Sequence, residues 1–220
     1  MKTFFSSIIV IITFYSCMHS QNKNVEILPG TLEKDSSANE GIATFAEGCF
    51  WHSEIVFQSL VGVRDAVSGY AGGTDPNPDY EKVSTGAIGH AETVQIYYDT
   101  SKISFETLVK AFFASHDPTT LNRQGNDIGT HYRSIAFYRN EKEKQIILKE
   151  IKRLSDLKTY KNKIVTEVVF FTKFYPAEEY HQEFIHKNPS NPYVQNVSIP
   201  DFLEFKKKFK GNYKLNYSFY

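Results

Sequence analysis

Cys49 lies in the stretch TFAEGCFW (residues 44–51), where a short apolar run ends in a glycine and two aromatic residues follow the cysteine. The pattern predicts a strand over 42–47 that turns sharply at Gly48 into a helix over 49–60. Unpaired N–H groups and the positive end of the helix dipole favour a thiolate there, and the thiolate is the reactive form of cysteine. The helix supplies about 0.3–1 kcal/mol, less than one pKa unit of about 1.36 kcal/mol. Further activation must therefore come from neighbouring groups or from a bound substrate.

Free cysteine is also among the most buried residue types, so a purely structural role for Cys49 is the alternative. Glu92 poses a similar question. In the predicted strand 91–98 it shares the more apolar face with Val94, Ile96 and Tyr98. Burial on that face would raise its pKa, because desolvation disfavours the charged form. The alternative places Glu92 in solvent at the frayed end of the strand, and periodicity alone does not decide between the two.

A polar, glycine-punctuated segment over 122–134, which includes Asp127, connects a helix to a strand. Such a density of polar side chains indicates a binding loop held by a scaffold, or simply a solvated connection. The sequence shows no metal-ligand spacing, no phosphate-binding glycine loop and no nucleic-acid module pattern. Its 25 basic and 25 acidic residues leave no net field that would attract nucleic acid. Two cysteines, Cys17 and Cys49, exclude a disulfide framework.

The elements that must position these side chains follow a regular order. We expect strands at 42–47, 61–68 and 91–98, with the helix 49–60 between the first two and a helix capped by Ser104 up to Ser115. Tyr80 falls in the long loop before the third strand. Further on we expect a strand at 134–138, a helix capped by Asn140, a strand at 163–171 and a last helix opening at 174–182.

This order predicts an α+β fold, a ferredoxin-like split βαβ sandwich with an additional helix and strand. An antiparallel sheet with helices on one side is the expected architecture. We assign the catalytic domain to 41–195 and a C-terminal extension to 196–220.

Residues 1–17 predict an export signal, because Lys2 precedes an apolar run that is too short for a comfortable membrane span. The run ends in a loose lipobox, with Cys17 as the residue that would carry the lipid. An ordinary signal peptide or an uncleaved anchor is the alternative. Residues 18–40 are polar and read as a flexible tether. We therefore expect an exported lipoprotein of a bacterial cell envelope.

Seven motifs occur in register, and together they closely resemble the A-type peptide methionine sulfoxide reductases over about residues 44–193. They are GCFW at 48–51, GYAGG at 69–73, NPDY at 77–80, GHAE at 89–92, RQGND at 123–127, HYRS at 131–134 and YHQ at 180–182. The resemblance implies reduction of the S epimer of methionine sulfoxide, free or in proteins, and hence protein repair after oxidative damage. It further implies that Cys49 attacks the sulfoxide sulfur, while Phe50 and Trp51 form an apolar wall for the substrate methyl group.

The same resemblance implies that Glu92 protonates the sulfoxide oxygen, that Tyr80 and Tyr132 hydrogen-bond it, and that Asp127 helps to orient the site. These implied roles are chemically consistent, since a sulfoxide oxygen leaves poorly unless a neutral acid protonates it. The product on Cys49 would be a sulfenic acid.

Many family members carry resolving cysteines near the C-terminus, whereas no cysteine follows Cys49 in this chain. We therefore expect the sulfenic acid to be reduced by an external thiol such as thioredoxin or dithiothreitol. We also expect a monomeric enzyme with no metal or bound cofactor. Its partners would be oxidised proteins or free methionine sulfoxide, a thioredoxin-like reductant and a membrane, with no nucleic acid. Two other functions compete: a papain-like thiol hydrolase with His131 or His181 as base, and a lipoprotein that binds oxidised peptides without turnover.

Overall fold

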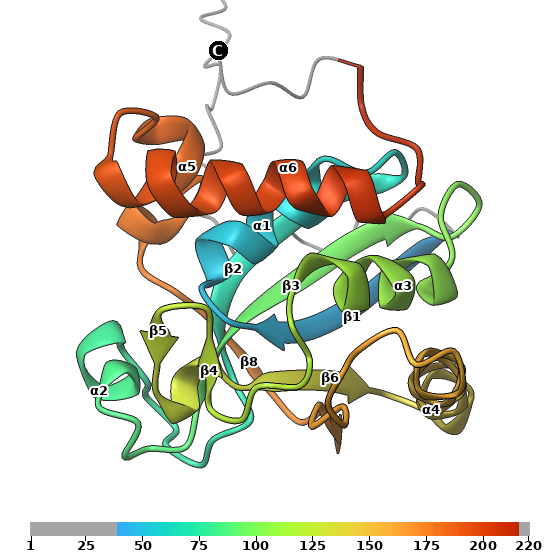
Figure 1. Cartoon of the computed structure of the whole chain (residues 1–220). Helices are drawn as coiled ribbons and strands as arrows, with labels where there is room; N and C mark the ends of the chain where they lie inside the picture. The colour runs from blue at the N-terminus through green and yellow to red at the C-terminus, as the bar shows by residue number, and fades with distance from the viewer. Residues whose placement is uncertain (1–38, 216–220) are drawn as a thin grey trace, which may run out of the picture.

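The computed structural model describes residues 39–215. Strands and helices alternate over residues 40–115, and their order is less regular beyond (Figure 1). The strands are β1 (Glu40–Glu47), β2 (Val63–Ala71), β3 (Ala91–Asp99), β4 (Arg123–Gln124), β5 (Asp127–Ile128), β6 (Ser134–Tyr138), β7 (Glu167–Phe170) and β8 (Phe174–Pro176). The α-helices are α1 (Phe50–Gln58), α2 (Tyr80–Ser84), α3 (Phe105–Ser115), α4 (Glu141–Asp156), α5 (Phe184–Lys187) and α6 (Ile199–Lys208). Short 3-10 turns at Thr130–Tyr132 and Glu179–His181 and a π-helix at Val194–Ser198 complete the list.

Six strands form one mixed sheet in the order β7-β6-β1-β3-β2-β8, and β4 pairs with β5 in a separate hairpin. Strand β1 runs antiparallel to β3 and β6, and β2 runs antiparallel to β3 and β8. Strand β7 pairs in parallel with β6, which differs from the expected antiparallel sheet. Helix α4 lies between β6 and β7 in the chain, and such a crossover returns the next strand in the same direction. The fold is therefore a mixed α/β arrangement.

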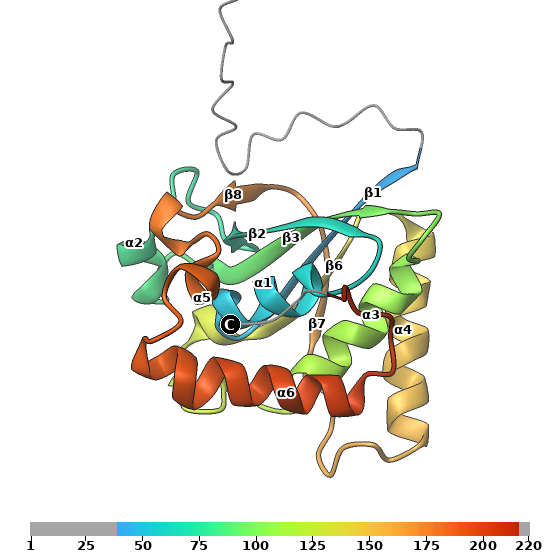
Figure 2. The same cartoon turned by 90° about the horizontal axis from the view of Figure 1, so that it is seen from above.

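Helices α1, α3, α4 and α6 lie on one side of the sheet, as the view from above shows (Figure 2). They bury one hydrophobic core against the strands. Phe45 of β1 and Phe112 of α3 stack with ring centroids 4.9 Å apart, and both are fully buried. Phe205 brings α6 into the same core at 1% exposure. The side chains that hold the first helix in place thus come from both ends of the described chain.

Side-chain caps fix two helix starts where the sequence predicts them. The Ser104 side chain accepts a hydrogen bond from the backbone N–H of Thr107, and the Asn140 side chain accepts one from that of Glu143. Each satisfies an N–H group that the helix itself leaves unpaired. Strand β6 also has its predicted bounds.

Other expectations are wrong. Residues 174–182 do not open a helix, because Phe174–Pro176 forms strand β8 against β2 and a 3-10 turn follows. Strand β2 continues to Ala71, through residues expected to lie in a loop. Tyr80 begins the short helix α2, where the Asp79 side chain caps the helix, so it does not lie in a loop. The predicted signal (1–17) and all but the last two residues of the tether (18–40) lie outside the described residues.

Candidate active site

Cys49 lies at the junction of β1 and α1, where it is the N-cap residue of the helix. Gly48 makes the turn possible, because its backbone has φ +104°, a conformation that other residues rarely adopt. Space is also restricted: a Cβ atom at Gly48 would lie 2.7 Å from the Cβ atom of Gln124. A glycine before the nucleophile therefore serves both the turn and the close approach of the β4–β5 hairpin.

The Cys49 side chain is half-buried. Burial raises the pKa of its thiol well above the ordinary value, and the neighbouring Glu92 and Asp127 carboxylates raise it further. The Trp51 backbone N–H and the Tyr193 hydroxyl act in the opposite direction. The helix terminus thus favours the thiolate as expected, but desolvation outweighs it. Cys49 is a protonated thiol at rest.

Glu92 lies on β3, opposite Tyr70 of β2, and is only 2% exposed. The solvent-exposed alternative for this residue is therefore wrong. Its Oε2 accepts a hydrogen bond of 3.0 Å from the backbone N–H of Phe50, in the first turn of α1. Burial raises the pKa of Glu92 to about 8 despite that hydrogen bond, and the Asp127 charge also raises it. A carboxyl group beside the cysteine is consequently neutral at pH 7.

One cavity of about 280 Å³ brings together all the site residues that the sequence singles out. It is lined by Cys49, Phe50, Trp51, Tyr80, Glu92, Asp127 and Tyr132, and also by Asn191 and Tyr193. Neither His131 nor His181, the candidate bases of a thiol hydrolase, is among the lining residues. The cavity therefore combines a thiol, a neutral acid, aromatic surface and phenol groups.

Tyr80 and Tyr132 reach the cavity from α2 and from the 3-10 turn before β6. Burial raises the pKa of Tyr80 to about 12, and it raises that of Tyr132 further. Both phenols therefore keep their protons and remain hydrogen-bond donors at neutral pH. Glu178 fixes the first of them, since its Oε1 accepts a 2.9 Å hydrogen bond from the Tyr80 backbone N–H.

Trp51 is held in position by a stacked ring and by a hydrogen bond at its edge. Its indole ring stacks on the Phe184 ring with centroids 3.6 Å apart and planes 5° apart. Its Nε1 donates a hydrogen bond of 3.2 Å to Nδ1 of His181, which is 2% exposed. Burial lowers the pKa of His181 to about 4, so its ring is neutral and Nδ1 is free to accept. His181 of the YHQ motif therefore helps to hold Trp51 in the aromatic wall.

Reasoning from the sequence missed Tyr193 and Asn191 as cavity residues. The Tyr193 hydroxyl donates a 2.6 Å hydrogen bond to Oδ2 of Asp127, and Asn191 Oδ1 accepts one from the Tyr193 backbone N–H. These residues lie in an irregular Pro/Asn-rich segment, where no periodicity indicates which side chains face inward. Asp127 is thus oriented by a residue 66 positions away.

Among residues 39–215, no group of three or more His, Cys, Asp or Glu side chains is arranged to hold a metal ion. The helices of the same residues include none that is long and apolar enough to cross a membrane.

Comparisons with known proteins agree with this geometry. The family model described as peptide methionine sulfoxide reductase matches residues 41–213. A protein of Nautilia profundicola named peptide methionine sulfoxide reductase MsrA is 49% identical over 172 residues, covering 78% of this chain and 98% of its own. Mxr1 of Saccharomyces cerevisiae in reduced form is similar in structure, with a TM-score of 0.68 and 34% identity over 74% of this chain and 92% of its own.

Mxr1 in complex with Trx2 is also similar, with a TM-score of 0.50 and 27% identity over 70% of this chain and 91% of its own. The family model spans the whole catalytic core, and the residues that carry the resemblance surround one cavity. The chain therefore belongs to the A-type peptide methionine sulfoxide reductases, oxidoreductases that reduce methionine (S)-S-oxide and so repair oxidised proteins.

Proposed function

We propose that this chain reduces methionine S-sulfoxide, free or in proteins, through a sulfenic acid on Cys49. One observation supports this mechanism above the others: a thiol and a carboxyl group that is neutral at pH 7 line the same cavity. Phe50 and Trp51 offer the apolar surface that suits the substrate methyl group. The phenols of Tyr80 and Tyr132 donate hydrogen bonds to the sulfoxide oxygen.

In the first step the Cys49 sulfur attacks the substrate sulfur while Glu92 gives its proton to the oxygen. This attack forms a sulfur–sulfur bond. The protonated oxygen then passes to the Cys49 sulfur as a hydroxyl group, so that the sulfur–oxygen bond of the substrate and the new sulfur–sulfur bond both break and a sulfur–oxygen bond forms on Cys49. The substrate sulfur is reduced by two electrons and Cys49 is oxidised to the sulfenic acid. The proton that Cys49 loses returns to Glu92, so the products are methionine and a sulfenic acid, with no net proton uptake.

In the second step an external thiol reduces the sulfenic acid, because Cys49 is the sole cysteine of the segment 18–220. One thiol displaces the oxygen as water and forms a mixed disulfide, and a second thiol releases Cys49. The structure of Mxr1 with Trx2 supports a thioredoxin-like protein as the physiological donor. Dithiothreitol serves the same purpose in vitro.

The decisive experiment offers separate S and R epimers of a methionine sulfoxide peptide with dithiothreitol. We expect turnover of the S epimer alone, none with Cys49→Ser, and a rate lower by about 10²–10⁴-fold with Glu92→Gln. Glu54→Gln is the matched control, because Glu54 is equally buried but does not line the cavity. Turnover of both epimers alike, or full activity of Glu92→Gln, would contradict the mechanism.

The finer description of the fold is also a proposal. Four of the strands follow the order β6-β1-β3-β2 with antiparallel neighbours, and this supports a ferredoxin-like split βαβ unit to which β7 and β8 are added. We further propose that the chain acts as a monomer, exported to a bacterial cell envelope and anchored there by a lipid on Cys17. The sequence pattern of residues 1–17 supports the export and the anchor.

A further inference from the structure

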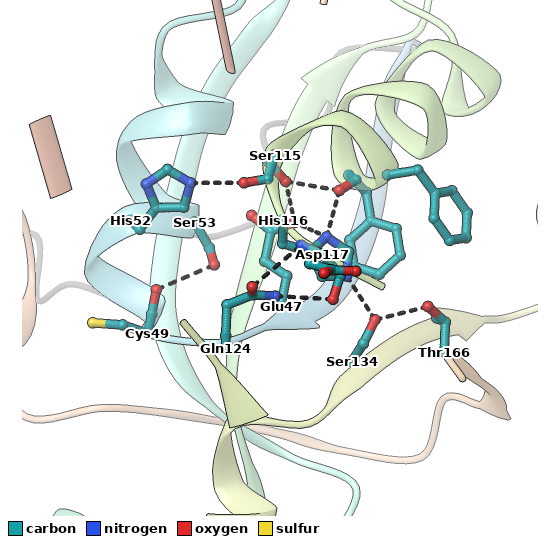
Figure 3. A network of polar contacts seen from close by, with 12 residues as sticks. Glu47, Cys49, His52, Ser53, Ser115, His116, Asp117, Gln124, Ser134 and Thr166 are labelled. Atoms are coloured by element: carbon teal, nitrogen blue, oxygen red, sulfur yellow. Dashed lines mark hydrogen bonds and ion pairs between the residues drawn. The ribbon is translucent and has the colours of Figure 1, made fainter. Parts of the chain in front are cut away.

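A second cavity, of about 220 Å³, touches Cys49 on the side that faces α3 and α6. Its walls come from the end of β1, the start of α1, the end of α3, the β4–β5 hairpin and the segment from Tyr193 to Lys208. Cys49, Asp127 and Tyr193 line both cavities, so these three residues form the partition. Figure 3 shows Cys49 at one edge of the polar network that lines this second space. The mechanism described above makes no use of it.

Three residues that line this cavity carry a buried polar atom without a hydrogen-bond partner: Ser198, Glu47 and His52, whose atom is Nδ1. Ser198 is 1% exposed, and its Oγ atom has no partner. Glu47 is also 1% exposed. Its Oε2 accepts a 2.6 Å hydrogen bond from Ser115, whereas Oε1 has no partner. Buried polar groups are normally satisfied, so atoms of this kind around a cavity indicate that it receives a polar molecule.

The charged groups on this wall are mostly acidic. Asp117, Asp127 and Asp201 line the cavity against a single ammonium group, that of Lys208. Glu204 also lines it, and forms an ion pair of 3.2 Å with Lys207. The buried groups add no charge at pH 7, because burial raises the pKa of Glu47 to about 8 and lowers that of His116 to about 4. The wall therefore disfavours an anion and favours a neutral or cationic molecule.

Access from this side suits the geometry of the second catalytic step. Displacement at sulfur is in line, so the attacking thiolate must approach opposite the departing oxygen. The proton donors for that oxygen, Glu92, Tyr80 and Tyr132, line the first cavity and do not line the second. Cys49 lines the second cavity as well, so a thiol inside it would approach from the side away from these donors.

We propose that the second cavity is an entry site for small reducing thiols, used in addition to a protein donor, and that it selects cationic or neutral thiols over anionic ones. The inference rests on the proposed function, since it needs the sulfenic acid. The entering thiolate forms a sulfur–sulfur bond with Cys49 as the sulfur–oxygen bond breaks. The oxygen leaves as water with a proton from Glu92, and that carboxylate regains a proton from solvent. A second thiol molecule then reduces the mixed disulfide, releasing the oxidised thiol dimer and the Cys49 thiol.

The test separates the two steps on the full enzyme. Excess methionine S-sulfoxide without reductant should yield a burst of about one equivalent of methionine, and a thiol is then added in a second mix. The probes are cysteamine (cationic), 2-mercaptoethanol (neutral) and 3-mercaptopropionate (anionic), compared at equal thiolate concentration. At low salt we expect cysteamine to react roughly 10-fold faster than 3-mercaptopropionate, and the difference to shrink at high salt through screening.

Two variants locate the effect. Ser198→Phe fills the cavity and should slow the reaction of all three thiols by about 10-fold or more, while the burst rate stays within about two-fold. Asp201→Asn should reduce the preference for cysteamine by roughly two-fold to three-fold. Because Asp201 lies at the surface, this variant keeps the test valid if Ser198→Phe fails to fold. Asp156→Asn, at the exposed end of α4, is the matched control and should change neither step.

The outcomes are distinguishable. Absence of a methionine burst would overturn the proposed function and this inference with it. A normal burst followed by thiol rates that ignore thiol charge, and that neither variant changes, would overturn the entry site alone.

Discussion

Two protons are held side by side at the reaction centre, one on the Cys49 thiol and one on the Glu92 carboxyl. Both pKa values are raised chiefly by burial. Two free N–H groups in the first turn of α1 act on different residues. The Phe50 N–H is hydrogen-bonded to Glu92, and the Trp51 N–H favours the thiolate of Cys49. The site at rest is therefore an acid without a strong nucleophile. Activation of the thiol must accompany substrate binding.

The protonation of Glu92 predicts how the first step depends on pH. The rate of methionine formation should fall as pH rises through about 8, because the carboxyl then loses the proton that the oxygen needs. Single-turnover rates between pH 6 and 9.5 measure this. Glu92→Gln should remove the falling limb, and Glu54→Gln should retain it. A rate that climbs steadily past pH 8 would mean that ionisation of the thiol governs the step instead.

For single residues, the sequence predicts which side chains form the site better than it predicts the surroundings of each side chain. Alternation along 91–98 places Glu92 among apolar residues, and the structure shows it buried. Reasoning from the helix terminus gave one small contribution to the pKa of Cys49 and left out desolvation, which depends on atoms supplied by distant segments. Tyr193 was missed for the same reason: its contact with Asp127 is set by the packing of an irregular segment, which leaves no local pattern.

Helix α1 is tied to the sheet and to α5 by the buried carboxyl of Glu54. Its Oε2 accepts a 2.7 Å hydrogen bond from Ser68 on β2, and its Oε1 accepts one of 2.8 Å from the backbone N–H of Glu183. Burial raises the pKa of Glu54 to about 8. The helix that begins at the nucleophile is thus anchored by a group that holds its proton in the folded state.

This anchor predicts how stability depends on pH. Between about pH 6.5 and 8 the folded state keeps protons on Glu47, Glu54 and Glu92 that the unfolded chain has released, so the free energy of unfolding should fall as pH rises. Each group contributes at most about 1.4 kcal/mol per pH unit. Chemical denaturation at pH 6.5, 7.25 and 8 measures the slope, and Glu54→Gln should make it shallower.

Two buried histidines set the lower limit of this pH range. Burial lowers the pKa values of His116 and His181 to about 4. As pH falls below about 6.5 these residues therefore lower the free energy of unfolding, which is opposite in sign to the effect of the carboxyl groups. An unchanged slope in Glu54→Gln would show that this carboxyl titrates alike in the folded and unfolded states.

Elements with a local signal could be predicted. Ser104 and Asn140 mark the starts of α3 and α4, and each makes its cap hydrogen bond. Elements that depend on tertiary pairing could not. Strand β8 forms because it pairs with the edge of β2. Helix α6 was not predicted, because its lysine-rich end makes the segment look exposed, although Ile199, Phe202 and Phe205 form a buried stripe.

For the whole molecule, the cellular location is predicted by the sequence of residues 1–17 and not by the folded residues 39–215. We expect Cys17 to carry a lipid after export, so the mature protein should sediment with membranes and incorporate labelled palmitate when it is expressed in a bacterium. Cys17→Ser should abolish the labelling and release the protein without loss of reductase activity, because residues 39–215 contain the whole cavity. Labelling that persists in Cys17→Ser would show that the lipid is elsewhere.

The contact between α6 and α1 also has a consequence for biosynthesis. Residues 50–58 leave the ribosome some 140 residues before residues 199–208, yet Phe205 belongs to the core on which the first helix rests. A nascent chain, or one cut short before its last helix, therefore leaves the future nucleophile open to cellular oxidants. A repair enzyme built in this way therefore needs its thiol to be kept reduced until synthesis is complete.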